Sequence, residues 1–288
     1  MEIPQLIFNG LVIGSIIALT AVGLTLTYGI LRLSNFAHAD FMTLGAYLTW
    51  VAKINGINLW ISMILGALGT IIAMIIAEYL LWKPMRDRRA NSTTLIVISI
   101  GLALFIRNGI LMIWGGNNQS YQLPLVPAQE FLGIKFERDR LIVMGLAIVA
   151  ITILHLLLQR TKLGKAMRAV ADNVDLAKVS GINVEKVVLW TWVITGGLTA
   201  FGGAMYGLIY TIKPTMGWFL TLPMFASVIL GGIGNPYGAI VGGLVVGIVQ
   251  ELSVSISWLG SEYKLGVSLL IMIFILLIRP QGIFKGMM

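Results

Sequence analysis

Long apolar runs separated by short polar stretches make up most of this chain. Six runs approach or exceed the roughly 17 residues that cross a hydrocarbon core as a helix, at residues 6–28, 59–82, 93–114, 141–158, 187–212 and 238–256. Three shorter runs, at 41–51, 221–233 and 265–278, are typical of tilted, broken or re-entrant helices shielded by protein. The pattern predicts an all-α fold, a polytopic transmembrane bundle of about eight or nine segments that forms one domain over residues 1–288.

Residues 160–186 interrupt this pattern with a polar, basic stretch between two apolar runs. Its apolar residues recur at steps of three and four, the period of one helix face: Leu163, Met167, Val170, Val174 and Ala177. The opposite face carries Lys165, Arg168, Asp172 and Asp175. Two interpretations follow from charge pattern alone: an amphipathic loop on anionic lipid, or a short helix docked into a soluble partner.

Composition agrees with a membrane protein. Hydrophobic residues are 58% of the chain, charged residues 11%, and the mean hydropathy of +0.91 exceeds what a soluble core can hide. The first apolar run has no basic cluster before it, so we interpret it as a retained helix and not as a cleaved signal peptide. The absence of cysteine excludes disulfides, thiolate catalysis and cysteine metal sites.

The distribution of basic residues predicts the orientation. Most of them lie at Arg32, in residues 83–89, in 160–186 and at the carboxyl end, and the positive-inside rule places these regions in the cytoplasm. Nine crossings would give an external amino terminus and a cytoplasmic carboxyl terminus, whereas eight would move one end to the other side. Since the net charge of +8 follows this topology, no nucleic-acid partner is predicted.

Several chemistries lack their motifs. No G-x-x-x-x-G-K-[ST] phosphate loop is present, so ATP hydrolysis would need another chain, and no H-E-x-x-H or G-x-S-x-G pattern supports a hydrolase. We predict neither a metal nor a cofactor. The residues Gly231, Gly232, Gly234 and Pro236 break an apolar run, and broken helices at membrane depth often line a transport path.

Polar residues inside the predicted membrane segments are candidate path residues, because a charge near a helix centre costs about 3 kcal/mol on insertion scales. Asn35, Phe36, His38 and Asp40 begin the second segment. The polar members can meet the charged groups of a zwitterionic solute, or hydrogen-bond one another and fix the start of the helix. Arg107 lies deep in the fourth segment with Glu78 and Glu251 as candidate partners, and a structural ion pair is favoured over a substrate clamp.

Four stretches of sequence resemble one family. Residues 33–47, LSNFAHADFMTLGAY, are similar to the N-F-A-H-G-E-x-x-x-L-G-A-Y signature of branched-chain amino-acid ABC importer permeases of the LivH type. Residues 161–183 resemble the cytoplasmic coupling loop of that family, 229–243 (ILGGIGNPYGAIVGG) its glycine-rich run, and 279–284 (RPQGIF) its carboxyl end. The motifs occur in the same order and span nearly the whole chain.

This resemblance implies an amino-acid permease in the bacterial inner (plasma) membrane, without enzyme activity of its own. It implies as partners a second homologous permease, two cytoplasmic ATPase subunits and an external solute-binding protein. Residues 160–186 would be the coupling segment, with its contacts to the ATPase at Leu163, Gly164, Arg168, Asp172 and Asn173, and with Gly181 as the turn that ends its helix.

Two departures from the family pattern limit the transfer of substrate preference. Ala39 and Asp40 stand where the family commonly has Gly and Glu, and Asn235 and Pro236 stand in its Gly-Ser position. A urea or short-amide permease of the same architecture is therefore an alternative. An intramembrane enzyme that uses Asp40 and His38 as an acid and base pair is an alternative of another class.

Overall fold

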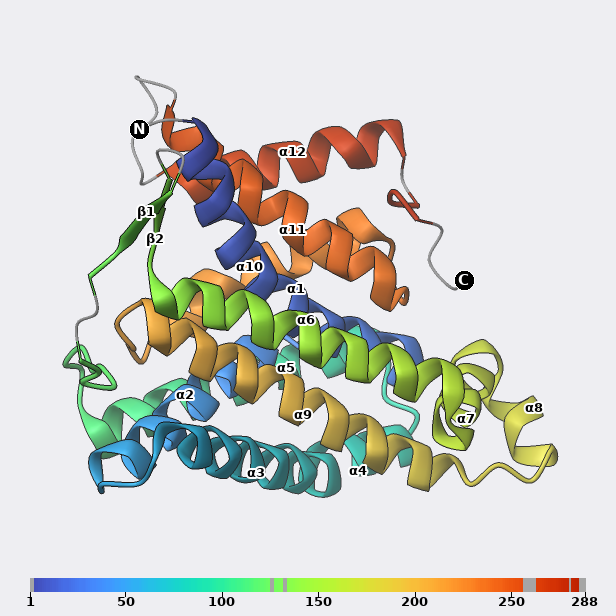
Figure 1. Cartoon of the computed structure of the whole chain (residues 1–288). Coiled ribbons are helices and arrows are strands. Elements are labelled where there is room, and N and C mark those ends of the chain that lie inside the picture. The colour runs from blue at the N-terminus through green and yellow to red at the C-terminus, as the bar shows by residue number, and fades with distance from the viewer. Residues whose placement is uncertain (1–2, 125–126, 132–133, 256–262, 280, 285–288) are drawn as a thin grey trace.

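The computed structural model describes residues 3–124, 127–131, 134–255, 263–279 and 281–284, and shows a helical bundle with a small hairpin at one end (Figure 1). The described helices longer than ten residues that match predicted runs are α1 (Ile3–Leu31), α2 (His38–Ile54), α3 (Leu59–Ala77), α5 (Ser92–Trp114), α6 (Arg138–Arg160), α9 (Val184–Ile209), α10 (Met216–Gly231), α11 (Pro236–Leu252) and α12 (Lys264–Ile278). Each predicted run is confirmed as a helix. The predicted end of the sixth long run, residue 256, lies outside the described residues.

Six of the described helical stretches are long and apolar enough to cross a membrane, in agreement with the six long runs. One of them is α3, which continues through a π-helical turn (Glu78–Trp82) into α4 (Lys83–Asp87). The all-helical prediction holds for the membrane part.

A β-hairpin lies in the predicted external gap between α5 and α6. Its strands β1 (Gln129–Phe131) and β2 (Ile134–Phe136) are antiparallel, and Gln129 pairs with Phe136. Gln5 at the start of α1 accepts from the Lys135 backbone N–H at 2.7 Å and donates to its carbonyl oxygen at 3.3 Å. The hairpin is thereby tied to the first turns of α1.

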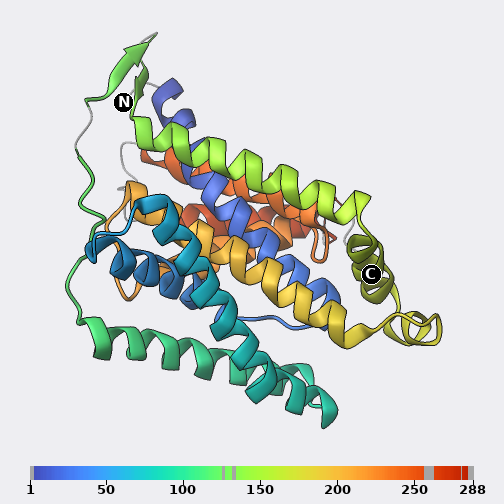
Figure 2. The ribbon, with the colours of Figure 1, turned by 60° about the horizontal axis from the view of Figure 1, so that its bottom comes forward.

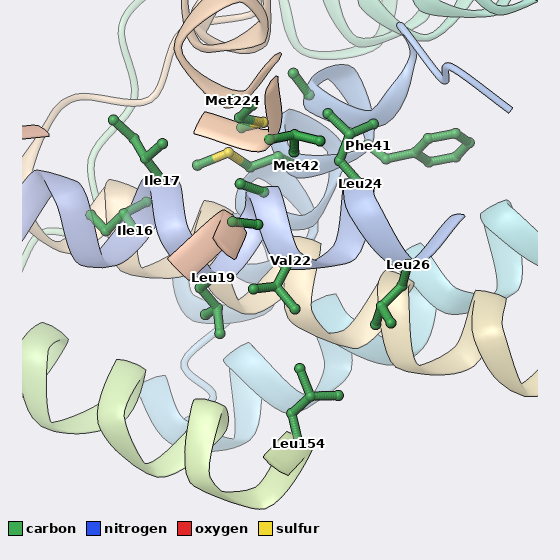
Figure 3. Packing of buried hydrophobic residues seen from close by; sticks show 14 of the residues in the cluster. Ile16, Ile17, Leu19, Val22, Leu24, Leu26, Phe41, Met42, Leu154 and Met224 are labelled. Carbon is green, nitrogen blue, oxygen red and sulfur yellow. The ribbon is translucent and has the colours of Figure 1, made fainter. Parts of the chain in front are cut away.

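Helix α1 runs through the middle of the bundle and is buried along most of its length. It packs closely on α9 and α11, and Gly14 and Gly247 allow the backbones of α1 and α11 to touch, because a Cβ on Gly247 would collide with the Gly14 backbone. In the apolar core around it, Met42 of α2 and Met224 of α10 lie on one side of α1, whereas Leu19 points to the other side, toward Leu154 of α6 (Figure 3).

Helices α2 and α10 each begin in the middle of the bundle. His38, the first residue of α2, binds the carbonyl oxygen of Thr20, which is 11 residues and about 16 Å before the end of α1. Residues 32–37, the return segment, bring the chain back to this depth. The first turn of α10 lies beside the first turns of α2, since the Gly217 N–H donates to Thr43 Oγ1 at 3.0 Å. These two short runs are therefore broken helices shielded by protein, one of the alternatives predicted for them.

The third short helix differs from its prediction. Of the described residues of α12, only Ser268 is buried, so this helix lies on the outside of α10 and α11 and is not shielded by protein. Its apolar side chains face the surroundings, as suits a helix in lipid. Helix α5 is also peripheral, and Figure 2 shows it along one edge of the molecule, where it packs on α2.

Candidate functional site

The central charged group of the membrane region joins α2, α5 and α10. Arg107 Nε and Nη2 each donate to one oxygen of Asp40 at 3.1 Å, and the guanidinium lies 4.9 Å from the ring of Trp218. The Asp40 side chain is 1% exposed and that of Arg107 15%. A bidentate pair of this kind satisfies a buried carboxylate, and the indole ring stabilises the cation further.

The prediction that Glu78 or Glu251 pairs with Arg107 is wrong. Glu78 begins the π-helical turn after α3 and contacts α4 and α9, whereas Arg107 lies 15 residues, about 22 Å, beyond the start of α5 and contacts α2 and α10. Glu78 instead binds Arg86 and Trp192 Nε1. Glu251 accepts from Lys264 Nζ at 2.6 Å and so ties the end of α11 to the start of α12. The preference for a structural ion pair at Arg107 agrees with the observed contact, but with Asp40 as the partner.

Asn35 and His38 lie next to Asp40 in sequence and have other partners. Asn35 Oδ1 accepts from the Ala37 N–H at 3.1 Å and so shapes the turn before α2. His38 Nε2 donates to the Thr20 carbonyl at 2.9 Å and lies 3.1 Å from Thr199 Oγ1 of α9. Within the described residues, Asn35 Nδ2 and His38 Nδ1 are buried without a hydrogen-bond partner.

His38 and Asp40 point in different directions, because residues two positions apart on an α-helix are separated by about 200° around its axis. His38 faces α1 and α9, and Asp40 faces α5. An acid and base pair needs both groups at one reacting atom, so this geometry gives the intramembrane enzyme no support. Phe36 stacks on Phe225 of α10 at 4.6 Å between ring centroids.

The glycine-rich break is confirmed between α10 and α11. Gly231 ends α10 and Pro236 begins α11, while Gly232 and Gly234 adopt φ of 103° and 87° that favour glycine. The Gly234 N–H donates to Thr25 Oγ1 at 2.9 Å. The freed backbone is therefore partly satisfied by α1.

This break lies at one end of the bundle and not in its middle. Tyr237, just after it, binds His155 Nδ1 at 2.8 Å and Gln159 Nε2 at 3.1 Å, near the end of α6. A small cavity beside it is lined by residues of α1, α7 and α11, among them Thr25, Met167 and Tyr237. The break thus adjoins the polar segment 160–186.

That segment folds as two short helices, α7 (Lys162–Asp172) and α8 (Val174–Val179), beyond the end of α6 (Figure 1). Thr161 caps α7 and Asn173 caps α8, each through a side-chain oxygen that accepts backbone N–H groups. Gly181 follows α8 with φ of 82°, in agreement with the predicted turn.

The predicted faces of 160–186 are correct in part. Met167, Val170 and Ala177 are buried and Leu163 is half-buried, but Val174 is exposed because Asn173 is extended and breaks the helix before it. An Asn before an acidic first turn is an N-cap signal, so the sequence held a hint of this break.

Two predicted contact residues of this segment point inward. Arg168 Nη1 donates to the carbonyl oxygen of Leu158 at the end of α6. Gly164 is buried where α7 turns back on α6, and a Cβ there would collide with the Leu157 and Leu158 carbonyl oxygens. Asp172 and Asn173 are exposed.

Sequence reasoning missed several residues of these sites. No sequence pattern marks Trp218, Trp192, Thr20 or Thr199, because tryptophan and threonine are ordinary residues in an apolar run. No group of three or more His, Asp or Glu residues that could hold a metal ion occurs among the described residues.

A multi-pass helical bundle, with half-length helices that meet at mid-depth and a helical polar segment at one end, defines the class of membrane transport permeases. The chain belongs to the branched-chain amino acid transport system / permease component family, whose model matches residues 6–276.

Individual members of this family and other import permeases are similar to the chain over most of its length. The permease protein LivH of the high-affinity branched-chain amino acid transport system of Salmonella typhimurium is 32% identical over 298 residues, which cover 97% of this chain and 94% of that protein. The corresponding BraD of Pseudomonas aeruginosa is 28% identical with the same coverage, and the ribose import permease RbsC of Bacillus subtilis is 29% identical over 96% of this chain and 83% of its own length.

Solved structures share the fold. PsaBC of Streptococcus pneumoniae, solved in complex with a Fab, has a TM-score of 0.56 at 13% identity and covers 98% of this chain and 93% of its own. A metal-chelate type ABC transporter in an inward-facing conformation has a TM-score of 0.50 at 17% identity, with 96% and 87% coverage.

Proposed function

We propose that this chain is the membrane-spanning subunit of an ATP-driven importer for branched-chain or other neutral amino acids in the bacterial inner membrane. It would act as a single permease domain, with a second homologous permease, two cytoplasmic ATPase subunits and an external solute-binding protein. The observation that carries this proposal is the α7–α8 segment, which exposes apolar side chains at the end of the bundle opposite the hairpin.

The exposed part of this segment suits a protein partner. Leu176 and Val179 on α8 are 60% and 82% exposed, and each is next to a charged residue, Asp175 and Lys178 respectively. Beneath them, Ala177 is buried and Asn173 caps the helix, so the surface is held in place. We assign Leu176, Val179 and Asp172 as ATPase contacts, with Gly164 and Arg168 fixing α7 against α6.

The substrate path is proposed at the start of α2. Helices α2 and α10 both present their amino ends at mid-depth, where the helix dipole favours negative charge, and Arg107 and Asp40 lie beside them. An amino acid carries one carboxylate and one ammonium group, so it can exchange partners with this pair without leaving a charge unpaired. Asn35 and His38 each offer a further polar atom at the same depth.

Reconstitution tests the proposal. The chain would be incorporated into vesicles with its second permease and ATPase subunits, and leucine, ribose and urea would be offered with their binding proteins. We expect ATP hydrolysis stimulated by the leucine-loaded binding protein, together with leucine uptake. Uptake of ribose or urea in preference to leucine would contradict the substrate class, and substrate turnover without ATPase partners would contradict the importer itself.

A further inference from the structure

Two polar contacts tie α9 to the end of α3, which lies along it (Figure 1). In the first, Trp192 Nε1 donates to Glu78 Oε2 at 2.7 Å, and Arg86 binds both oxygens of the same carboxylate. In the second, Lys83 Nζ lies 3.1 Å from Glu185 Oε1. We call these five residues the charged joint.

The π-helical turn makes both contacts possible. The Lys83 N–H donates to the Glu78 carbonyl oxygen five residues earlier, as in a π-helix. In an α-helix, residues five apart point about 140° away from each other. The wider turn instead brings Glu78 and Lys83 close to one line, so both side chains reach α9. Single π turns inside helices occur frequently at functional sites.

The two contacts are seven residues apart on α9, two turns of one helix face. A helix held at two such points cannot rotate against its neighbour without losing one contact. The Glu78 side chain is 5% exposed and Trp192 is fully buried, so separation would leave the Trp192 N–H buried without an acceptor, while Glu78 would keep only Arg86. The Lys83–Glu185 pair is more exposed and is the weaker of the two contacts, since a solvated ion pair contributes little.

The position of the joint connects it to the proposed coupling segment. Glu185 lies within residues 160–186, in the first turn of α9, which follows α8 through the Gly181 turn. A cavity of about 380 Å³ separates the joint from α8 and is lined by Glu78, Lys83 and Arg86 on one side and by Val174 and Lys178 on the other. This space lets residues 160–186 move, while the joint keeps α9 and α3 attached to each other.

We propose that the charged joint passes a displacement of the coupling segment, residues 160–186, from α9 to α3. The joint thereby sets the position of α3 during transport. This inference rests on the proposed function. Glu78, Lys83, Arg86, Glu185 and Trp192 would be positioning residues that do not touch the transported solute.

A charge exchange in the complete reconstituted transporter tests this. We expect Lys83→Glu or Glu185→Lys alone to lower uptake per ATP hydrolysed at least threefold, while the ATPase subunits still copurify with the chain. The double exchange, Lys83→Glu with Glu185→Lys, should restore at least half of the wild-type ratio. Arg88→Glu is the control, because this substitution makes the same charge change as Lys83→Glu. Arg88 is exposed, lies next to the joint and has no described ion-pair partner.

The milder variants Glu185→Gln and Trp192→Phe serve if a reversed charge prevents assembly, and both should lower the same ratio. Wild-type uptake per ATP in the single variants, or no recovery in an assembled double variant, would overturn the joint. A wild-type transporter without leucine-stimulated ATP hydrolysis would instead overturn the proposed function, so the two failures are distinguishable.

Discussion

At the residue scale, the Asp40–Arg107 pair is the feature with the largest energetic consequence. Both groups are mostly withdrawn from solvent and satisfy each other in two hydrogen bonds. Removal of one partner of a buried pair costs about 3–5 kcal/mol, because the other charge stays behind unpaired. A structural role and a transport role both predict damage from a single substitution, so a neutral pair is needed to separate them.

The first prediction uses that neutral pair. Arg107→Ala should lower the free energy of unfolding of the purified chain by about 3–5 kcal/mol. Asp40→Asn combined with Arg107→Gln should recover most of the stability, since two uncharged groups can still hydrogen-bond, yet leave leucine uptake low. Thermal unfolding and vesicle uptake measure the two effects. Full uptake by the double variant would show that the pair serves the fold alone.

A second prediction concerns Gly164. Gly164→Ala should destabilise the turn between α6 and α7 by about 1–3 kcal/mol, because the new methyl group meets two backbone carbonyl oxygens. Gly145→Ala is the control for the same substitution at an open position: Gly145 lies in the first half of α6, with no atom within 4 Å of the new methyl group, and alanine is favoured over glycine in a helix. Thermal unfolding of both variants checks this, and equal effects would contradict the close contact.

At the scale of elements, α8 is a short helix whose fold and proposed contacts use different residues. Ala177 and the Asn173 cap hold it in place, whereas Leu176 and Val179 face outward. The exposed pair can therefore change without loss of the helix.

The third prediction follows from this division. Leu176→Ser with Val179→Ser should weaken ATPase binding at least tenfold, about 1.4 kcal/mol, with little change in thermal stability. Copurification of the ATPase subunits over a concentration series measures it. Leu277→Ser, equally exposed on α12, is the control and should bind as wild type. Unchanged binding by the α8 variant would remove this helix from the docking surface.

At the scale of the whole molecule, the two ends of the bundle carry different elements. The hairpin and the start of α1 lie at one end, and α7 and α8 lie at the other (Figures 1 and 2). The positive-inside rule assigns the second end to the cytoplasm.

The fourth prediction tests this orientation with the natural absence of cysteine. A single cysteine at Lys178→Cys should react with a membrane-impermeant thiol reagent only after the cytoplasmic face is opened. Gln129→Cys in the hairpin should react in intact cells. Labelling of Lys178→Cys from outside would reverse the orientation and remove the ATPase-docking role of α8.

The membrane class, the helix positions and the break before α11 followed from the sequence by itself. Continuous apolar runs are unfavourable in water, and a cluster of glycines followed by proline favours the end of one helix and the start of the next, so these features depend on local composition. The Gly181 turn and the helical character of 160–186 were local in the same way.

Partners across the bundle were decided only by the tertiary structure. Asp40 and Arg107 are 67 residues apart and Glu78 and Trp192 are 114 apart. The return segment sets the depth of Asp40, and the π turn sets the direction of Lys83, yet neither leaves a periodic signal in the sequence. Local pattern fixes where helices form, whereas the contact between two charges depends on helix depth and rotation, which arise only when the helices pack together.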